Sequence, residues 1–422
     1  MQTSAMNLLK TDTYELVHID RHRPIPRYAI LSHRWEPSEI TYNVIATLKP
    51  SALTVLRNPS FPSLPPSLHA SAAKIRGACA IALQQRLMYI WIDTCCIDKT
   101  KSEELRYALS MMFRWYRSAA VCYTYFNDIT FDKPSEKMFK SDRADRRGQP
   151  SEWFERGWTL QELLAPQKMQ FYDKRWRYMG TRHELASLVG KIAGIHFEYL
   201  NGERNLNEAS CATKMSWMAG RVTSLVEDVA YSLIGLFDVD LLPIYGEGTK
   251  AFIRLQEAIM HEFGRFDESL FAWKRPQDGI LQSYRHEPRV QYFKHDKWGL
   301  FAPSPDCFKN SGNIVVKKDL VHMRPNGDFR LSHQGIVFSL PSTDVKHRFG
   351  GLRNEINFPL QCWRNGSGGV SETIVLKLAR VPNGEIFRAQ CNNLTSQKGV
   401  KISSKGGVVI AVAQPRLDMC IR

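Results

Sequence analysis

The sequence predicts an α/β fold built on a doubly wound parallel sheet, and three observations lead to this prediction. Short apolar runs at residues 28–32, 87–92, 119–126 and 169–172 have the composition of buried strands. Between them, apolar residues recur at helical spacing, at 75–83, 105–116 and 158–164. Because parallel neighbours need long crossover connections, this alternation predicts one sheet covered by helices on both faces.

Local signals mark where these elements begin and end. Pro24 and Pro26 set off the first strand from the preceding chain. Thr100 and Glu103 have the form of a capping box at the start of the second helix. Pro166 stops the helix at 158–164. The predicted elements are therefore short and well separated.

Ligands of doubly wound sheets bind outside the carboxyl ends of the strands. This rule selects the turn Ser32–Trp35 after the first strand, the turn Asp93–Cys96 after the second, and residues 127–128 after the third. We expect these three turns to meet at one crevice.

The pattern changes after the predicted sheet. From about residue 206, apolar residues recur at helical spacing in three stretches between 212 and 263, and from about 311 short β-type runs are separated by turn residues, as in a sandwich or barrel. We therefore expect an α/β core over 1–205, a helical extension over 206–310 and a smaller β-rich C-terminal domain over 311–422.

Composition narrows the class of protein. The chain has 422 residues, 43% of them hydrophobic, and no uncharged apolar window of ~18 residues, so we expect a soluble, cytoplasmic protein without a transmembrane segment. The formal net charge is +15, but the densest basic run, 133–147, contains three acidic residues. It is expected to be a solvated loop, with no specific nucleic acid as partner. Nine cysteines without a Cys-x-x-Cys motif predict neither a disulfide scaffold nor a metal site.

Three sequence blocks resemble a known family. Residues 28–35, 91–98 and 153–166 are similar, in order, to the signature blocks of the fungal HET (heterokaryon incompatibility) domain, and the resemblance covers roughly residues 1–310. Arg34 departs from it, since the family more often has a small residue there. The resemblance implies an intracellular cell-death effector of self/non-self recognition, whose partners are further copies of itself or another incompatibility protein.

A weaker resemblance concerns mechanism. The run Trp158–Leu163 is similar to the third block of the TIR domain, in which a glutamate serves NAD cleavage in the enzymatic members. It implies a TIR-like sheet, Glu162 as the matching glutamate, and NAD as a substrate without any prosthetic group. A carboxylate stabilises the oxocarbenium-like state of such a cleavage. The alternative is a non-enzymatic signalling module that acts by homotypic assembly, so the sequence leaves enzymatic activity open.

Each candidate site residue has a functional and a structural interpretation. Glu162 is the catalytic carboxylate, an exposed helical carboxylate, or a partner of Arg156 or Arg175. The first strand ends at the predicted crevice with Ser32, His33 and Arg34. In the functional interpretation the arginine binds a pyrophosphate and the histidine bonds a ribose; in the structural one these residues cap the end of the sheet. Trp35 stacks on a base or closes the core, and we favour core packing.

The remaining candidates lie on the second strand turn and the third block. Asp93 accepts a hydrogen bond from a ligand hydroxyl or fixes its own loop. Trp158 lies one helical turn before Glu162 and either shapes the site or anchors the helix, of which anchoring is favoured. Cys95 and Cys96 are expected to be buried, unreactive thiols.

Overall fold

The computed structural model describes residues 5–20, 22–47, 65–262, 267–277, 279–285, 298–316, 330–332, 335–341, 355–365, 371–380, 386–391, 395–397 and 407–412. It divides into two compact units, Met1–Glu203 and Arg204–Arg422.

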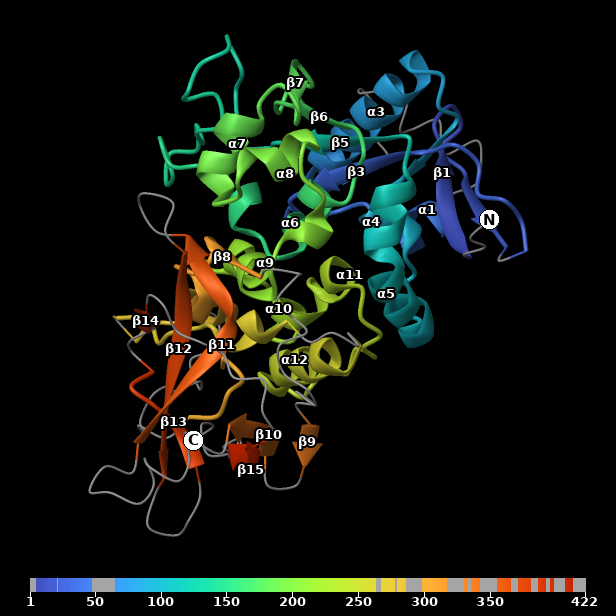
Figure 1. Cartoon of the computed structure of the whole chain (residues 1–422). Coiled ribbons are helices and arrows are strands. Elements are labelled where there is room, and N and C mark those ends of the chain that lie inside the picture. Colours follow the sequence, from blue (N-terminus) through green and yellow to red (C-terminus); the bar gives the residue numbers. More distant parts are fainter. Residues whose placement is uncertain are drawn as a thin grey trace. The chain divides into compact units, whose positions relative to one another are not determined.

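The first unit contains a seven-stranded mixed sheet in the order β2-β1-β4-β3-β5-β6-β7 (Figure 1). Its strands are β1 (Met6–Lys10), β2 (Leu16–Ile19), β3 (Ala29–His33), β4 (Tyr89–Trp91), β5 (Val121–Tyr125), β6 (Met169–Tyr172) and β7 (Tyr178–Thr181). The four strands predicted from the sequence, β3 to β6, are parallel where they pair with one another. The sheet is not parallel throughout, however, because β1, β2 and β7 pair antiparallel at its two edges.

The parallel strands lie in the interior. Every residue of β3 is buried, and Ala29 to His33 pair in register with Val121 to Tyr125 of β5. A strand covered on both faces needs apolar side chains at consecutive positions, which explains the continuous apolar run at 28–31. The antiparallel strands β1, β2 and β7 are short and mixed in polarity, so they left no comparable signal in the sequence.

Helices lie on both faces of this sheet. On one face, the Tyr123 hydroxyl donates to Gln85 Oε1, just after α3 (His69–Gln84), at 3.1 Å. On the other face lie α5 (Ser102–Ser118) and α6 (Trp158–Leu164). Gln161 Nε2 of α6 donates a hydrogen bond to Met112 Sδ of α5 at 3.2 Å. The unit is completed by α1 (Tyr42–Thr47), α4 (Asp93–Cys96), η3 (Glu152–Glu155), α7 (Ala186–Ala193) and α8 (Phe197–Asn201).

The capping box expected before α5 is wrong. The Thr100 hydroxyl donates instead to Asp98 Oδ1 at 2.6 Å, and α5 begins after Lys101 without a side-chain cap. The backbone N–H of Thr100 donates to the same carboxylate oxygen at 3.1 Å. Asp98 therefore closes a turn, because a short acidic side chain can bond the backbone two residues ahead.

The second unit combines short helices with a second sheet. Its helices are α9 (Cys211–Met218), α10 (Asp228–Tyr231), α11 (Ile234–Phe237) and α12 (Lys250–Glu262). The eight strands are β8 (Ile314–Val315), β9 (Arg330–Ser332), β10 (Gly335–Pro341), β11 (Glu355–Asn365), β12 (Ser371–Arg380), β13 (Ile386–Ala389), β14 (Thr395–Gln397) and β15 (Gly407–Val412). These described strands form one mostly antiparallel sheet rather than the two sheets of a sandwich.

The turn at 245–248 has a structural explanation. Glu227 Oε1 accepts backbone N–H groups of Gly246 and Gly248 at 2.8 and 2.9 Å. Both glycines have positive φ, at 96° and 62°, which other residues adopt only under strain. Across the described residues, no helix combines the length and the apolar character needed to span a bilayer.

Candidate functional site

The candidate site lies where the parallel strands of the first unit end. β3 ends at His33, β4 leads directly into α4 at Asp93, and α6 brings Glu162 to the same edge. These residues are far apart in the sequence, and their polar contacts form two separate groups, one around Glu162, Ser32 and Trp153 and the other around Asp93 and Trp35. They lie at the carboxyl ends of the parallel strands, where the strand-end rule predicts a ligand site.

Glu162 is held by a chain of two hydrogen bonds. The Ser32 hydroxyl donates to Glu162 Oε2 at 2.5 Å, and the indole Nε1 of Trp153 donates to Ser32 Oγ at 2.9 Å. Glu162 is 7% exposed, so the interpretation as an exposed helical carboxylate is wrong. The pKa of its carboxyl is raised to about 8, mainly by burial; the bond from Ser32 opposes the shift and the negative charge of Asp93 adds to it.

His33 lies between two carboxylates without bonding either. Its Nδ1 is 3.8 Å from Asp93 Oδ1, and its Nε2 is 3.9 Å from Glu39 Oε1. Within the described part of the chain, both buried ring nitrogens lack a hydrogen-bond partner. Burial lowers the pKa of His33 well below its ordinary value, helped by the cation of Lys74. The imidazole is therefore neutral at pH 7.

Asp93 joins this buried group to the rim of the site. Its Oδ2 accepts the indole N–H of Trp35 at 2.6 Å, and the Lys99 ammonium lies 3.2 Å from the centre of the Trp35 ring. Burial raises the pKa of Asp93, although Lys99 and the bond from Trp35 oppose this. Trp35 is 43% exposed, which contradicts the favoured interpretation that it closes the core. The ring is available at the surface beside a cation and a carboxylate.

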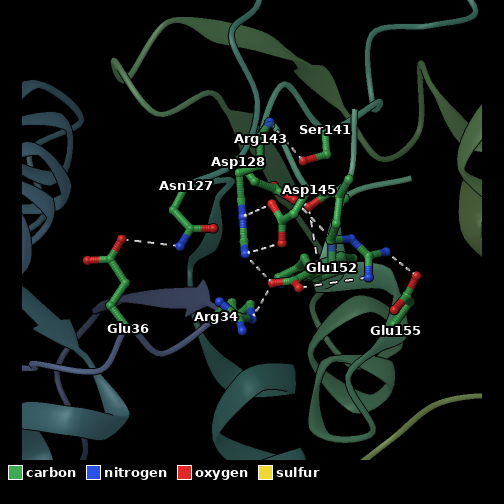
Figure 2. A network of polar contacts seen from close by, with 12 residues as sticks. Arg34, Glu36, Asn127, Asp128, Ser141, Arg143, Asp145, Glu152 and Glu155 are labelled. Atoms are coloured by element: carbon green, nitrogen blue, oxygen red, sulfur yellow. Dashed lines mark hydrogen bonds and ion pairs between the residues drawn. The ribbon is translucent and has the colours of Figure 1, made fainter. Parts of the chain in front are cut away.

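Arg34 points to a different set of residues. Its Nε lies 2.8 Å from Glu152 Oε2, and Nη1 of Arg143 lies 2.8 Å from the same oxygen. Figure 2 shows both arginines at this carboxylate. Asp128 accepts the backbone N–H of Glu152 at 3.0 Å. The network therefore fixes η3, the segment that leads into α6, and Arg34 is paired with protein rather than turned toward Asp93.

The basic run at 133–147 belongs to this network. Arg143 also pairs with Asp145 (Figure 2). Arg146 pairs with Glu155. The segment is a mostly exposed loop, as expected, and its ion pairs with Glu152 and Glu155 attach it to η3. Ion pairs between residues nine apart in a loop leave no periodic pattern in the sequence, so this attachment was not predicted.

Sequence reasoning missed a buried ion pair behind His33. The Lys74 ammonium contacts Glu39 Oε1, with the two side chains 1% and 6% exposed. Ser71, one turn before Lys74 in α3, donates to Glu39 Oε2 at 2.8 Å. A lysine on the apolar face of a helix is a signal that could have indicated such a pair, because buried lysines need a partner.

The remaining candidates take no direct part in these contacts. Trp158 begins α6 one turn before Glu162 and is partly buried. Cys95 and Cys96 are buried, and burial raises the pKa of the Cys95 thiol to about 12. Among the residues that the structure describes, no cluster of histidine, cysteine and acidic side chains could hold a metal ion.

Comparisons with known proteins relate this chain to a known family. Residues 28–138 match the model of the heterokaryon incompatibility protein (HET) family, and residues 250–350 match a domain of unknown function (DUF8212). No solved structure matches the chain. The chain is 38% identical over 336 residues to the vegetative incompatibility protein HET-E-1 of Podospora anserina, a match that covers 76% of this chain and 22% of that relative. These matches support a HET domain in this chain, and the matched residues 28–138 include β3 and β4 of the candidate site.

Proposed function

We propose that this protein promotes cell death in incompatibility reactions by hydrolysing NAD at the nicotinamide glycosidic bond, with Glu162 as the catalytic carboxylate. The observation that carries the proposal is the oriented, buried carboxyl of Glu162 at the carboxyl edge of the parallel strands. The match to a vegetative incompatibility protein supports the biological role. The TIR-like run from Trp158 to Leu163 supports the chemistry.

The chemistry needs one negative charge. The bond between ribose C1′ and the nicotinamide nitrogen breaks, and its electron pair neutralises the pyridinium, so nicotinamide leaves without an acid. The ribose becomes an oxocarbenium-like cation, which the Glu162 carboxylate stabilises. Water then adds to C1′ and releases a proton, which leaves ADP-ribose. The bonds from Trp153 to Ser32 and from Ser32 to Glu162 hold the carboxylate oxygen in place before the charge develops.

The pKa of Glu162 sets the pH dependence. At a pKa of about 8, most of the carboxyl is protonated at pH 7. The cationic nicotinamide ring favours the ionised form when NAD binds, because an opposite charge nearby lowers the pKa of a carboxyl. We therefore expect kcat/KM, which reports the free protein, to rise from pH 6 to pH 8.5 and to level off above the pKa.

The neighbouring groups suit the rest of the substrate. The exposed ring of Trp35 offers a stacking surface for a base, and Asp93 can accept a ribose hydroxyl. The neutral imidazole of His33 can donate one hydrogen bond and accept another. Arg34 is already paired with Glu152, so it is not assigned to the pyrophosphate.

A second candidate function has one observation in its favour. Glu162 is only 7% exposed, and its bond from Ser32 links α6 to β3. A carboxyl that only joins a helix to a sheet would have the same geometry. In that case the domain acts as a signalling module that assembles with its own kind and recruits a killing partner.

The decisive experiment separates the two candidates at Glu162. Purified full chain is incubated with NAD and a crowding agent, and nicotinamide is measured by chromatography. Glu162→Gln keeps the shape and removes the charge, so release should fall on the order of a hundred- to a thousandfold. Glu184→Gln, at an exposed carboxylate outside the site, serves as the matched control and should keep the wild-type rate. Absence of nicotinamide release by wild type, with cell killing retained by Glu162→Gln, would refute the hydrolase and favour assembly.

A further inference from the structure

A cavity of about 420 Å³ lies at the amino-terminal ends of the parallel strands β5 and β6. Glu162 lies at the opposite, carboxyl-terminal end of the parallel strands. Val121 and Met169, the first residues of β5 and β6, line the cavity. Thr181, the last residue of the antiparallel β7, lines it as well. It is therefore a separate place in the fold, and none of the candidate site residues contributes to it.

The charge of this cavity has one sign. Four basic side chains line it, Arg27, Lys168, Arg182 and His183, and no aspartate or glutamate does. Among the described residues, none of these four forms an ion pair. The basic residues of the 133–147 loop behave differently, since Arg143 and Arg146 are matched by acids. Cations gathered without counterions at a concave surface attract an anion, because the cavity walls limit screening by water.

Arg182 is the fixed part of this arrangement. Its Nε donates to the carbonyl of Leu200 at 2.9 Å, and its Nη1 donates to the carbonyl of Leu163 at 2.6 Å. Burial lowers its pKa to about 10, so the guanidinium is still charged at pH 7. A guanidinium held by backbone carbonyls on one side is already ordered before an anion arrives, which reduces the entropic cost of binding.

The size and the lining indicate the rest of the ligand. Gln170 and Asn201 offer neutral donors and acceptors, and Leu87 and Leu200 offer apolar surface. The volume lies toward the small end of the ~300 to 1,000 Å³ usual for ligand pockets, which suits a compact molecule. A phosphate monoester meets the requirement for charge, since its oxygens accept several bonds from arginine and lysine at once.

We propose that this basic cavity, lined by Arg27, Lys168, Arg182 and His183, is a binding site for a small phosphorylated molecule with a polar body, of the size of a sugar phosphate. The site goes beyond the proposed hydrolysis, since it shares no residue with it. Arg182 bonds the carbonyl of Leu163, the residue that follows Glu162 in α6. Occupancy of the cavity therefore steadies the carboxyl end of the helix that carries Glu162.

The test measures binding directly and needs no NAD. Calorimetry at ~150 mM NaCl uses the full chain with three probes: ribose 5-phosphate, inorganic phosphate, and ribose as the neutral counterpart. We expect ribose 5-phosphate to bind most tightly, phosphate more weakly, and ribose not at all. Raising the salt concentration should weaken binding of both anions, since their attraction is screened.

Variants assign the binding to the cavity. The double variant Arg27→Gln/Lys168→Gln changes two exposed side chains and should weaken ribose 5-phosphate at least tenfold. Arg182→Lys should also weaken ribose 5-phosphate binding at least tenfold. Because this substitution also removes bonds to the carbonyls of Leu200 and Leu163, the double variant is the primary test. Lys191→Gln, an exposed lysine of α7 that does not line the cavity, is the matched control and should bind as wild type does. Failure of both anions to bind wild type, or equal affinity in the double variant, would overturn the proposal.

Discussion

Glu162→Gln makes a prediction about stability that does not depend on any activity. A carboxyl with a pKa of about 8 in the folded protein and 4.5 as its ordinary value binds its proton more tightly when folded. Between these two values the folded state holds a proton that the unfolded state has released. The free energy of unfolding therefore falls as the pH rises from about 4.5 to about 8, and the loss is complete above pH 8.

The magnitude follows from the size of the shift. Each pKa unit corresponds to about 1.4 kcal/mol, so the shift at Glu162 corresponds to about 5 kcal/mol across this range. The neutral amide of Glu162→Gln cannot titrate, so the variant lacks this loss. Relative to wild type, it should gain about 5 kcal/mol between pH 4.5 and pH 8.5, whatever the substitution costs at low pH.

The assay must report on the first unit alone. Hydrogen exchange at increasing urea, followed by mass spectrometry, gives the opening free energy of peptides from β3 and α6. Glu184→Gln serves as a control in which the pH dependence of the unfolding free energy has the opposite sign. Bonds from the backbone N–H and hydroxyl of Thr181 hold the pKa of Glu184 below its usual range, so any stabilisation by Glu184 is lost as the pH falls. A difference between wild type and Glu162→Gln that stays constant from pH 4.5 to pH 8.5 would refute the raised pKa.

Two further predictions concern the buried groups around the site. Glu39→Gln leaves the Lys74 ammonium buried without its counterion and should destabilise the first unit by ~3 to 5 kcal/mol in urea unfolding. The double variant Glu39→Gln/Lys74→Met should recover much of this loss. Equal destabilisation by both variants would contradict the ion pair. Cys95, a buried thiol with its pKa raised to about 12, should resist iodoacetamide at pH 8 in the native protein and react after unfolding in urea; modification of Cys95 in the native protein, located by peptide mapping, would disprove its burial.

Local patterns were sufficient to predict the elements that carry the candidate site. The helix expected at 158–164 and the strand expected at 169–172 have the same bounds as α6 and β6. Pro166 marks the end of the helix, and a buried apolar run indicates the strand, so both signals are contained in a few consecutive residues. The antiparallel strands β1, β2 and β7 depend on pairing with a neighbour, and their sequences alone did not indicate them.

The sequence predicted which end of the sheet these residues occupy, but not the contacts that each residue makes there. The strand-end rule placed Ser32, Asp93 and their neighbours together because the parallel strands share one direction. It could not show that Trp35 is held at the rim by its bond to Asp93, or that Arg34 turns to Glu152. Such choices depend on which partner lies within about 3 Å, which the sequence does not state.

By itself, the sequence determined the α/β class, the order of the central elements and the end of the sheet where Glu162 lies. Only the tertiary structure decided that Glu162 is buried against Ser32, a residue 130 positions earlier, with its pKa raised to about 8. It likewise gathered Arg27, Lys168 and Arg182 around one cavity. The physical reason is the same in both cases. Secondary structure follows from periodicity along the chain, whereas desolvation and Coulomb energies depend on distances between residues that only folding brings together.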